Sequence, residues 1–367
     1  MNVEREIAGF ALPFTAGIFV SVSQIWPICC FQTVLYLSTT GVLLIYLSHP
    51  HHKKTTVRTK GILIVITAFF CGITTGATHH LISSGLPSSS NGLAPMLTAL
   101  GNGMSAAINR IPFQSKDTNA IINALLTGYR SDLPAAISEA FRDSGASHIL
   151  ALSGMHLGII YGIVHKVMSL AGNGRIAERI RSIIVLTICG TYTLTTGAGP
   201  SITRAFIFIA IAETARLTRR YKSTKSLFYS ALIIQLTISP MSIKSIGFQL
   251  SYAAMAGIAF VYPHIRDLWP TSTGKIRGLT KRIWESASLS IACQITTGPL
   301  AWLYFHTFPK YFLLTNLIAI PLTGLIIPFA IINMILNQLG ACPHIMTRAT
   351  ECLVDTLTAA LEIISSI

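Results

Sequence analysis

The sequence predicts an all-α polytopic membrane protein, and three observations lead to this fold class. Hydrophobic residues make up 51% of the 367 residues and charged residues only 11%, whereas soluble globular domains carry about 25% charged residues. The mean hydropathy is +0.60. Apolar runs recur along the chain at lengths near the ~20 residues that a helix needs to cross a bilayer. This composition excludes soluble, disordered, collagen-like and coiled-coil proteins.

The predicted spans are taken from these apolar runs in chain order. The runs lie near 7–26, 29–48, 61–82, 147–170, 182–198, 200–217, 226–239, 246–263, 283–305, 311–337 and 345–366. The run at 226–239 is short, and the run at 311–337 contains Pro321 and Pro328, which remove backbone hydrogen bonds and kink helices. The latter stretch is either one bent span or two short ones, so we expect about ten or eleven transmembrane helices.

Positive charge is concentrated in alternate loops, which predicts the orientation of the chain. The segments at 49–60, 166–182, 216–225 and 264–282 carry net charges of +4, +3, +5 and +4. Because positively charged loops stay in the cytoplasm, we expect these segments and the N-terminus to lie there. Topology therefore accounts for the net charge of +14 without any affinity for nucleic acid.

One long segment, 83–146, separates two groups of spans and would face outward. After a Ser/Gly/Pro-rich linker, 95–111 and 117–127 have the pattern of short amphipathic or re-entrant helices on the outer face. The chain therefore divides into an N-terminal three-helix membrane segment (1–82), this extracytoplasmic segment, and a membrane core (147–367).

Polar residues enter an apolar helix between residues 147 and 160, at His148, Ser153 and His156. Such groups are costly at membrane depth and usually face a cavity or a partner helix, which makes them functional candidates. A serine near a histidine also makes an intramembrane hydrolase a candidate, because a nucleophilic serine needs a nearby base. The sequence shows no carboxylate that would orient that base. The simpler interpretation is helix packing. Small residues repeat on the same helix and let a second helix approach closely, at Gly154, Gly158 and Gly162.

The sequence predicts no metal site and no cofactor. It contains no HExxH motif, and the pairs His51–His52 and His79–His80 have no further ligands beside them in sequence.

The sequence GAGPSITR at 197–204 predicts a helix N-terminus that attracts anions. Pro200 stands where a helix would start, Ser201 can accept first-turn N–H groups, and Arg204 lies one turn further on. A helix N-terminus already favours negative charge, an arginine strengthens that preference, and phosphate is one anion that fits. The alternative is that Arg204 caps neighbouring carbonyls.

Further polar side chains occur inside other predicted spans, at Gln249, Ser251, Gln294 and Asn316. Each alone is explained by an interhelical hydrogen bond worth about 1 kcal/mol. Together they describe a bundle with a polar interior, which suits a pore or a transporter better than a passive anchor.

These blocks resemble the ComEC competence family of bacterial inner-membrane proteins, which import DNA during natural transformation. SHILALSGMHLGII resembles the family signature H-L-L-A-I-S-G-L-H-I and matches it at His148, Ser153, Gly154 and His156. LLTGYRSDLP and AFRDSGASH resemble its lead-in and include Arg142. Three later blocks of the family are resembled by GPSITRAFIF, SIGFQLSYAAMAGI and TNLIAIPLTGLIIP. The residues that match in these blocks include Pro200, Arg204, Gln249, Ser251, Asn316 and Pro321. Five blocks in order over about 220 residues make the resemblance specific.

The resemblance implies an inner-membrane channel that translocates single-stranded DNA into the cytoplasm. Typical members also carry an oligonucleotide-binding-type β-barrel, and many carry a metallo-β-lactamase-like domain. We find no room for the barrel between 83 and 110 and no HxHxDH-like motif, so we expect a minimal form that conducts DNA and is not an enzyme. The implied partners are single-stranded DNA, the lipid bilayer and, as separate proteins, a nuclease, a DNA receptor and a cytoplasmic helicase or single-strand-binding protein.

The residues expected to line the DNA conduit or bind anions are Arg142, His148, Ser153, His156, Arg204, Gln249, Ser251 and Asn316. Those expected to pack helices are Gly154, Gly158, Gly162, Pro200 and Pro321. Two other functions stay open: a small-molecule or ion transporter, and an intramembrane serine hydrolase that uses Ser153 and His156.

Overall fold

The computed structural model describes most of the chain, and the described residues form helices and turns without a strand. They are 3–23, 57–85, 93–170, 172, 174–219, 223–268, 275–306 and 310–366. The predicted span at 29–48 lies outside the described residues.

Two compact units make up the chain. The first comprises Met1–Ser90 and Ala210–Tyr252, and the second comprises Asn91–Ile209 and Ala253–Ile367. These units are defined by packing and not by the membrane, so the division into membrane and extracytoplasmic segments stays a prediction.

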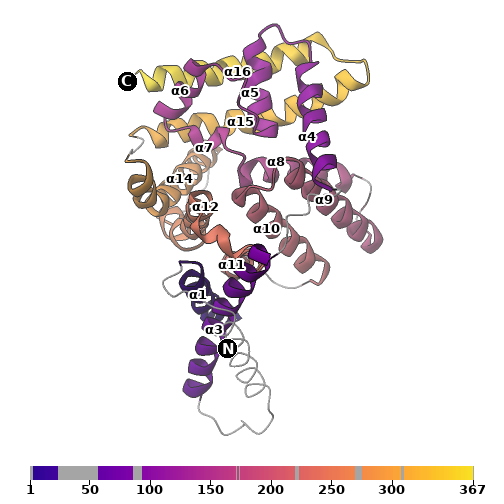
Figure 1. Cartoon of the computed structure of the whole chain (residues 1–367). Coiled ribbons are helices and arrows are strands. Elements are labelled where there is room, and N and C mark those ends of the chain that lie inside the picture. The colour runs from indigo at the N-terminus through magenta and orange to yellow at the C-terminus, as the bar shows by residue number, and fades with distance from the viewer. Residues whose placement is uncertain are drawn as a thin grey trace. The chain divides into compact units, whose positions relative to one another are not determined.

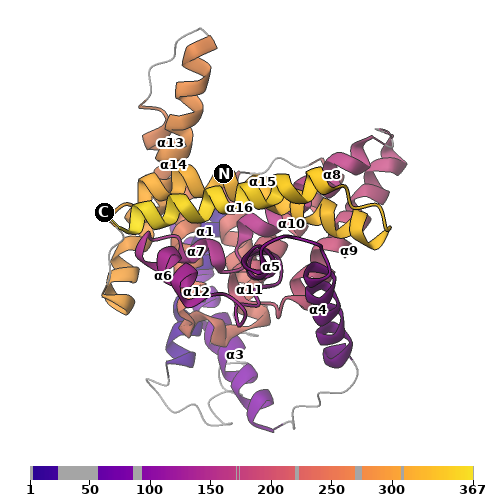
Figure 2. The same cartoon turned by 90° about the horizontal axis from the view of Figure 1, so that it is seen from above.

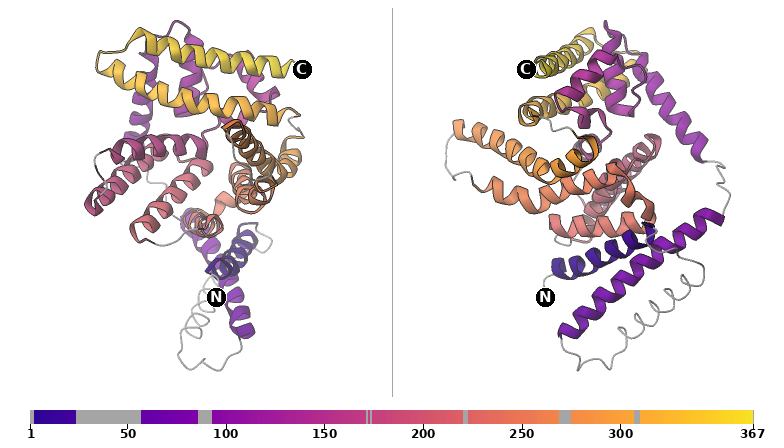
Figure 3. Two further views of the ribbon diagram at one scale, coloured as in Figure 1. Left: turned by 180° about the vertical axis from the view of Figure 1, so that it is seen from behind. Right: turned by 60° about the vertical axis from the view of Figure 1, so that its left-hand side comes forward.

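In the first unit, α1 (Val3–Val22) and α3 (Val57–Gly85) cross closely at two glycines, which Figure 3 shows in indigo and purple. A Cβ at Gly17 would overlap the carbonyl oxygen of Phe69, and a Cβ at Gly72 would overlap a carbonyl oxygen of α1. Small residues allow this close approach of two backbones. The two glycines therefore fix where the helices cross.

The rest of the first unit contains the C-terminal part of α10 (Pro200–Leu217), α11 (Thr224–Ile238), the 3₁₀ helix η2 (Pro240–Lys244) and the start of α12 (Ile246–Ala256). The buried Tyr252 hydroxyl donates to Oε1 of Gln235 at 3.0 Å. Its ring lies 5.8 Å from that of Phe228 and 4.5 Å from that of Phe248, centroid to centroid. An aromatic cluster with a satisfied hydroxyl thus joins α11 to α12.

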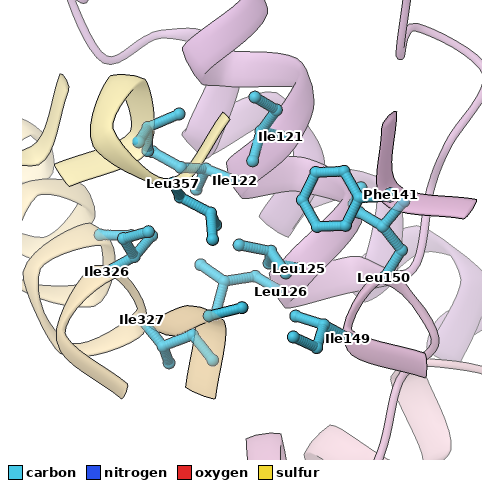
Figure 4. Packing of buried hydrophobic residues seen from close by; sticks show 14 of the residues in the cluster. Ile121, Ile122, Leu125, Leu126, Phe141, Ile149, Leu150, Ile326, Ile327 and Leu357 are labelled. Atoms are coloured by element: carbon cyan, nitrogen blue, oxygen red, sulfur yellow. The ribbon is translucent and has the colours of Figure 1, made fainter. Parts of the chain in front are cut away.

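The largest core of the second unit joins helices from the middle and the end of the chain. It involves α4 (Leu93–Asn109), α5 (Lys116–Thr127), α6 (Ala135–Asp143), α7 (Ser147–Leu150), α15 (Phe312–Gln338) and α16 (His344–Ser365). Figure 4 shows apolar side chains converging from α5, α6, α7, α15 and α16, among them Ile122, Leu125, Phe141, Ile149, Ile327 and Leu357. The predicted short helices at 95–111 and 117–127 are confirmed as α4 and α5.

The long apolar run at 311–337 forms a single helix, α15, that contains both Pro321 and Pro328. It runs antiparallel to α16, and the two lie side by side in Figures 1 and 2. Asn333 links them through Nδ2, which donates to the hydroxyl of Thr350 at 2.7 Å. Of the two alternatives for this run, the single continuous helix is therefore the one observed.

A second cluster of the same unit joins α8 (Gly154–Ser169), α9 (Arg175–Thr195) and the N-terminal part of α10. The expectation of one apolar helix through His148, Ser153 and His156 is wrong. The chain forms α7, leaves the helical conformation and begins α8 at Gly154, because Ser153 is extended (φ −121°, ψ 168°) and caps the new helix.

The second unit also contains the rest of α12, a π-helical turn η3 (Gly257–Val261), α13 (Tyr262–Arg266) and α14 (Lys275–Phe305). A Cβ at Gly257 would lie 2.5 Å from the carbonyl oxygen of Ala292, so glycine allows η3 to pack directly on the α14 backbone.

Three described helices are long and apolar enough to cross a membrane. They are Glu4–Val22, Ile246–Arg266 and Phe312–Gln338, and Ile64–His79 is a shorter apolar helix. The predicted class, an all-α membrane protein, is confirmed. The number of spans stays a prediction.

Candidate functional site

The start of α8 is held by reciprocal hydrogen bonds between Ser153 and the first turn. The Ser153 hydroxyl accepts the N–H of Met155 at 3.3 Å, and the Ser153 N–H donates to Nδ1 of His156 at 3.2 Å. This is a capping box in which histidine occupies the position usually held by Glu or Gln. The capping box explains locally why the helix begins at Gly154.

The His156 ring is fully buried, and its Nδ1 also lies 2.9 Å from the Ser153 hydroxyl oxygen. A serine beside a buried imidazole can serve as a helix cap, a nucleophile with its base, or part of a polar binding site. The hydrogen bonds at Nδ1 fit the first role, because the Ser153 side chain and this ring nitrogen both serve the cap.

His148 lies on the short helix α7, before the break, and the residue as a whole is exposed. Its Nδ1 lies 3.1 Å from the carbonyl oxygen of Gly145, which can only accept, so the hydrogen belongs on Nδ1. Gly145 has a left-handed φ of 82°, which favours glycine.

Arg204 brings positive charge to the start of α8 from a distant part of the sequence. The helix α10 begins at Pro200 as predicted, and Arg204 is 8% exposed on its next turn. A Cβ at Gly154 would lie 3.3 Å from Nη2 of Arg204 and 3.2 Å from Cβ of Ala205. The absence of a side chain at Gly154 therefore allows the guanidinium to reach the first turn of α8.

Gly158 and Gly162 differ from Gly154. At both positions an added Cβ would meet no atom within 4 Å in the described part of the chain. The helix packing expected there stays a prediction.

Arg142 lies at the end of α6 on the surface of the second unit. Its Nε is 3.0 Å from Oδ1 of Asp143, and both side chains are more than half exposed. Hydrogen bonding to Asp143 raises the pKa of Arg142 above its ordinary value. A neighbouring carboxylate thus partly offsets the positive charge that Arg142 was expected to offer DNA.

The remaining predicted residues are divided between the two units. Gln249 and Ser251 belong to the first, where Nε2 of Gln249 donates to the carbonyl oxygen of Ile243 at 3.0 Å and Ser251 is buried. Asn316 belongs to α15 in the second, and its Oδ1 is buried without a hydrogen-bond partner among the described residues. The structure therefore brings His156, Ser153 and Arg204 together, and their shared role with the other residues stays a prediction.

Sequence reasoning missed a buried ion pair in the first unit. Glu213 is 1% exposed, and its Oε2 lies 2.6 Å from Nη2 of Arg216 on the same helix. The i,i+3 spacing of an acid and a base at the end of an apolar run was a visible signal for it.

Two shallow grooves lie on the second unit. One, of about 760 Å³, runs along α16 past Arg348, Glu351 and Asp355, and the other, of about 700 Å³, is apolar and runs past Gln294 and Trp302. Within the described ranges, no three His, Cys, Asp or Glu side chains come together as a metal site.

Comparison with known proteins identifies the family. The sequence model of the Competence protein family matches residues 125–367, which include α7, α8, α10, α15 and α16. The chain belongs to the Competence protein family. The resemblance drawn from its motifs is therefore confirmed, and Ser153, His156 and Arg204 all lie inside the matched region.

Individual relatives are similar to about three fifths to two thirds of the chain. ComE operon protein 3 of Bacillus subtilis (strain 168) is 26% identical over 227 residues, 61% of this chain and 27% of the relative. The uncharacterized protein YcaI of Escherichia coli (strain K12) is 25% identical over 66% of this chain and 32% of its own length. Competence protein ComA of Neisseria gonorrhoeae is 25% identical over 58% of this chain and 31% of its own length. The chain thus spans about a third or less of these relatives. No solved structure matches it.

Proposed function

We propose that this chain passes single-stranded DNA across the membrane into the cytoplasm during natural transformation. The observation that carries the proposal is the buried Arg204, which packs on the start of α8 inside the region matched by the Competence family. A cation held away from water in a membrane protein is costly and is usually retained for a substrate or a partner charge. DNA presents a phosphate at every nucleotide, and cationic side chains are the groups that bind it.

The membrane that fits this role is the bacterial inner membrane, with the N-terminus in the cytoplasm. The four positively charged segments support this orientation, because positive loops stay inside. We also propose that DNA degradation, reception and cytoplasmic pulling belong to separate partners: a nuclease, a DNA receptor, and a helicase or single-strand-binding protein.

The proposal is tested in a naturally competent bacterium that carries this gene. The gene is deleted and then complemented with the wild type, Arg204→Lys or Arg204→Gln, and DNase-protected labelled DNA is counted separately in periplasm and cytoplasm. We expect the deletion to abolish cytoplasmic DNA while periplasmic DNA persists. Unchanged cytoplasmic DNA in the deletion strain would overturn the proposal.

A second candidate, an intramembrane serine hydrolase, is favoured by the 2.9 Å separation of the Ser153 hydroxyl and Nδ1 of His156. Against it, the same Nδ1 accepts the Ser153 N–H, and the serine oxygen accepts the Met155 N–H. A base that already accepts a backbone donor is weakened for proton abstraction. A fluorophosphonate probe that labels the wild type at Ser153 would favour the hydrolase.

The third candidate, a small-molecule or ion transporter, predicts substrate uptake by reconstituted vesicles in the absence of DNA. No contact in the described residues favours it over the DNA channel.

A further inference from the structure

The hydrogen on the His156 ring is assigned by its neighbours. The backbone N–H of Ser153 points at Nδ1 from 3.2 Å, and a backbone N–H can only donate. Nδ1 must therefore be an acceptor, since a hydrogen there would face a second donor. The neutral ring then carries its hydrogen on Nε2, and the Ser153 hydroxyl can donate to Nδ1 as well.

This assignment leaves a buried donor without an acceptor. The His156 side chain is 0% exposed, and its Nε2 has no hydrogen-bond partner among the residues that the structure describes. Buried N–H groups are almost always paired, because leaving one unpaired forfeits its hydration. Capping therefore explains the hydrogen bonds of Nδ1 but leaves the N–H group of Nε2 unexplained.

Positive charge lies at the helix turn that carries His156. His156 belongs to the first turn of α8, at the positive end of the helix dipole, and the buried Arg204 guanidinium reaches Gly154 on the same turn. Both groups are held at the junction between Ser153 and the first turn of α8. An anion with oxygen acceptors complements an N–H donor and a cation at this junction, and phosphate has that chemistry.

We infer that His156, through Nε2–H, and Arg204, through its guanidinium, bind one phosphate group at the first turn of α8. The phosphate can come from a DNA strand or from a lipid headgroup. The DNA source rests on the function proposed above, whereas the site itself does not. Ser153 positions the ring and does not contact the phosphate.

Two substitutions of His156 separate this role from capping. Gln and Glu are the usual residues at this position of a capping box, so His156→Gln and His156→Glu both keep an acceptor for the Ser153 N–H. His156→Gln also keeps an N–H donor, whereas His156→Glu has none and adds negative charge. If His156 only caps the helix, the two variants should bind phosphate equally. If it belongs to a phosphate site, His156→Gln should bind phosphate more tightly than His156→Glu.

The measurement uses the full chain in a maltoside detergent free of phosphate. Binding is measured for inorganic phosphate, for oligothymidylate with ordinary or uncharged methylphosphonate linkages, and for added phosphatidylglycerol. We expect His156→Gln to bind phosphate within a few-fold of the wild type, and His156→Glu and Arg204→Gln to bind it about ten-fold more weakly or worse. Wild-type affinity in a folded His156→Glu would overturn the inference.

A second measurement reads the hydrogen position on the wild-type ring directly. Nitrogen-15 spectra of histidine-labelled wild type should show His156 protonated at Nε2 and not at Nδ1, with the Nε2 signal moving when phosphate is added; the resonance is assigned by its loss in His156→Gln. A hydrogen on Nδ1, or no response to phosphate, would overturn the inference.

The ligand arms identify the source, and the transformation assay tests the function separately. Binding of ordinary but not methylphosphonate oligothymidylate assigns the site to DNA, whereas a response to phosphatidylglycerol alone assigns it to lipid. If the site binds phosphate but the deletion strain imports DNA normally, the inference stands and the proposed function fails. If deletion abolishes import but a folded His156→Glu binds phosphate normally, the proposed function stands and the inference fails.

Discussion

The core around α5, α15 and α16 and the junction of α7 and α8 both bury polar side chains, but they satisfy them differently. In the core, the Thr315 hydroxyl donates to the carbonyl oxygen of Ser144 at 2.7 Å, and Asn333 pairs with Thr350 at 2.7 Å. At the junction, the fully buried ring of His156 has one nitrogen in a cap and the other without a partner in the described chain. The first arrangement serves the fold, and the second leaves a donor for something else.

The Glu351 carboxylate extends the contrast. It is nearly buried, and it accepts the N–H groups of Gln114 and Ser115 at the start of α5. A negative charge at a helix N-terminus is thus supplied by the protein itself. At the start of α8, a charged group that lies nearby is Arg204, whose charge has the same sign as that end of the helix dipole.

One residue of the core departs from the pattern. The Thr118 hydroxyl is buried without a partner among the described residues. A hydroxyl can rotate to reach a nearby oxygen, whereas the His156 ring is fixed by Ser153. An unpaired ring N–H is therefore the stronger sign of an external ligand.

The largest effect is expected for Arg204→Gln, with Arg142→Gln as its matched control. Arg204 is buried beside α8, whereas Arg142 is exposed and pairs with Asp143. Loss of a charge-assisted contact predicts a fall in cytoplasmic DNA of about ten-fold or more for Arg204→Gln. Arg142→Gln should stay within about two-fold, because exposed ion pairs contribute little. The measurement is DNase-protected cytoplasmic DNA at matched protein levels. Equal losses in both variants would contradict the claim that the buried Arg204 contributes more to DNA passage than the exposed Arg142.

A core substitution tests the other side of the comparison. Asn333→Ala leaves the Thr350 hydroxyl without this partner and opens a small cavity between α15 and α16. We expect the free energy of unfolding to fall by about 1–3 kcal/mol, with phosphate affinity unchanged per folded molecule. Thermal unfolding in detergent and the phosphate-binding assay measure the two quantities. A loss of phosphate affinity in the folded variant would mean that the two regions are not independent.

A smaller effect is expected where only the geometry changes. At Gly154 a methyl group would lie 3.3 Å from the Arg204 guanidinium, whereas at Gly158 it would meet nothing within 4 Å. Gly154→Ala should therefore displace Arg204 and weaken phosphate binding several-fold, while Gly158→Ala should leave it unchanged. Equal affinities for the two variants would show that the guanidinium does not need this close approach.

How much of this was predictable from the sequence depends on the range of the interactions. Composition and apolar runs predicted the helical membrane class, and the run at 200–217 coincides with α10. The break before α8 was missed because the hydrophobic pattern continues through it. Its local signal was the three-residue spacing of Ser153 and His156, a capping box with an unusual partner. The contact between Arg204 and Gly154 joins residues 50 positions apart in the numbering, and spacing within one segment cannot reveal it.

The smallest expected effect separates capping by Ser153 from nucleophilic catalysis. Asn caps helices about as well as Ser, so Ser153→Asn should keep α8, with stability within about 0.5 kcal/mol of the wild type and DNA uptake nearly unchanged. Ser153→Ala removes the hydroxyl that accepts the Met155 N–H, and should cost about 1 kcal/mol. A hydrolase would lose its activity in both variants alike, since neither keeps a nucleophile. Uptake abolished in a stably folded Ser153→Asn, together with fluorophosphonate labelling of wild-type Ser153, would therefore favour the hydrolase, whereas retained uptake confines Ser153 to holding the histidine in place.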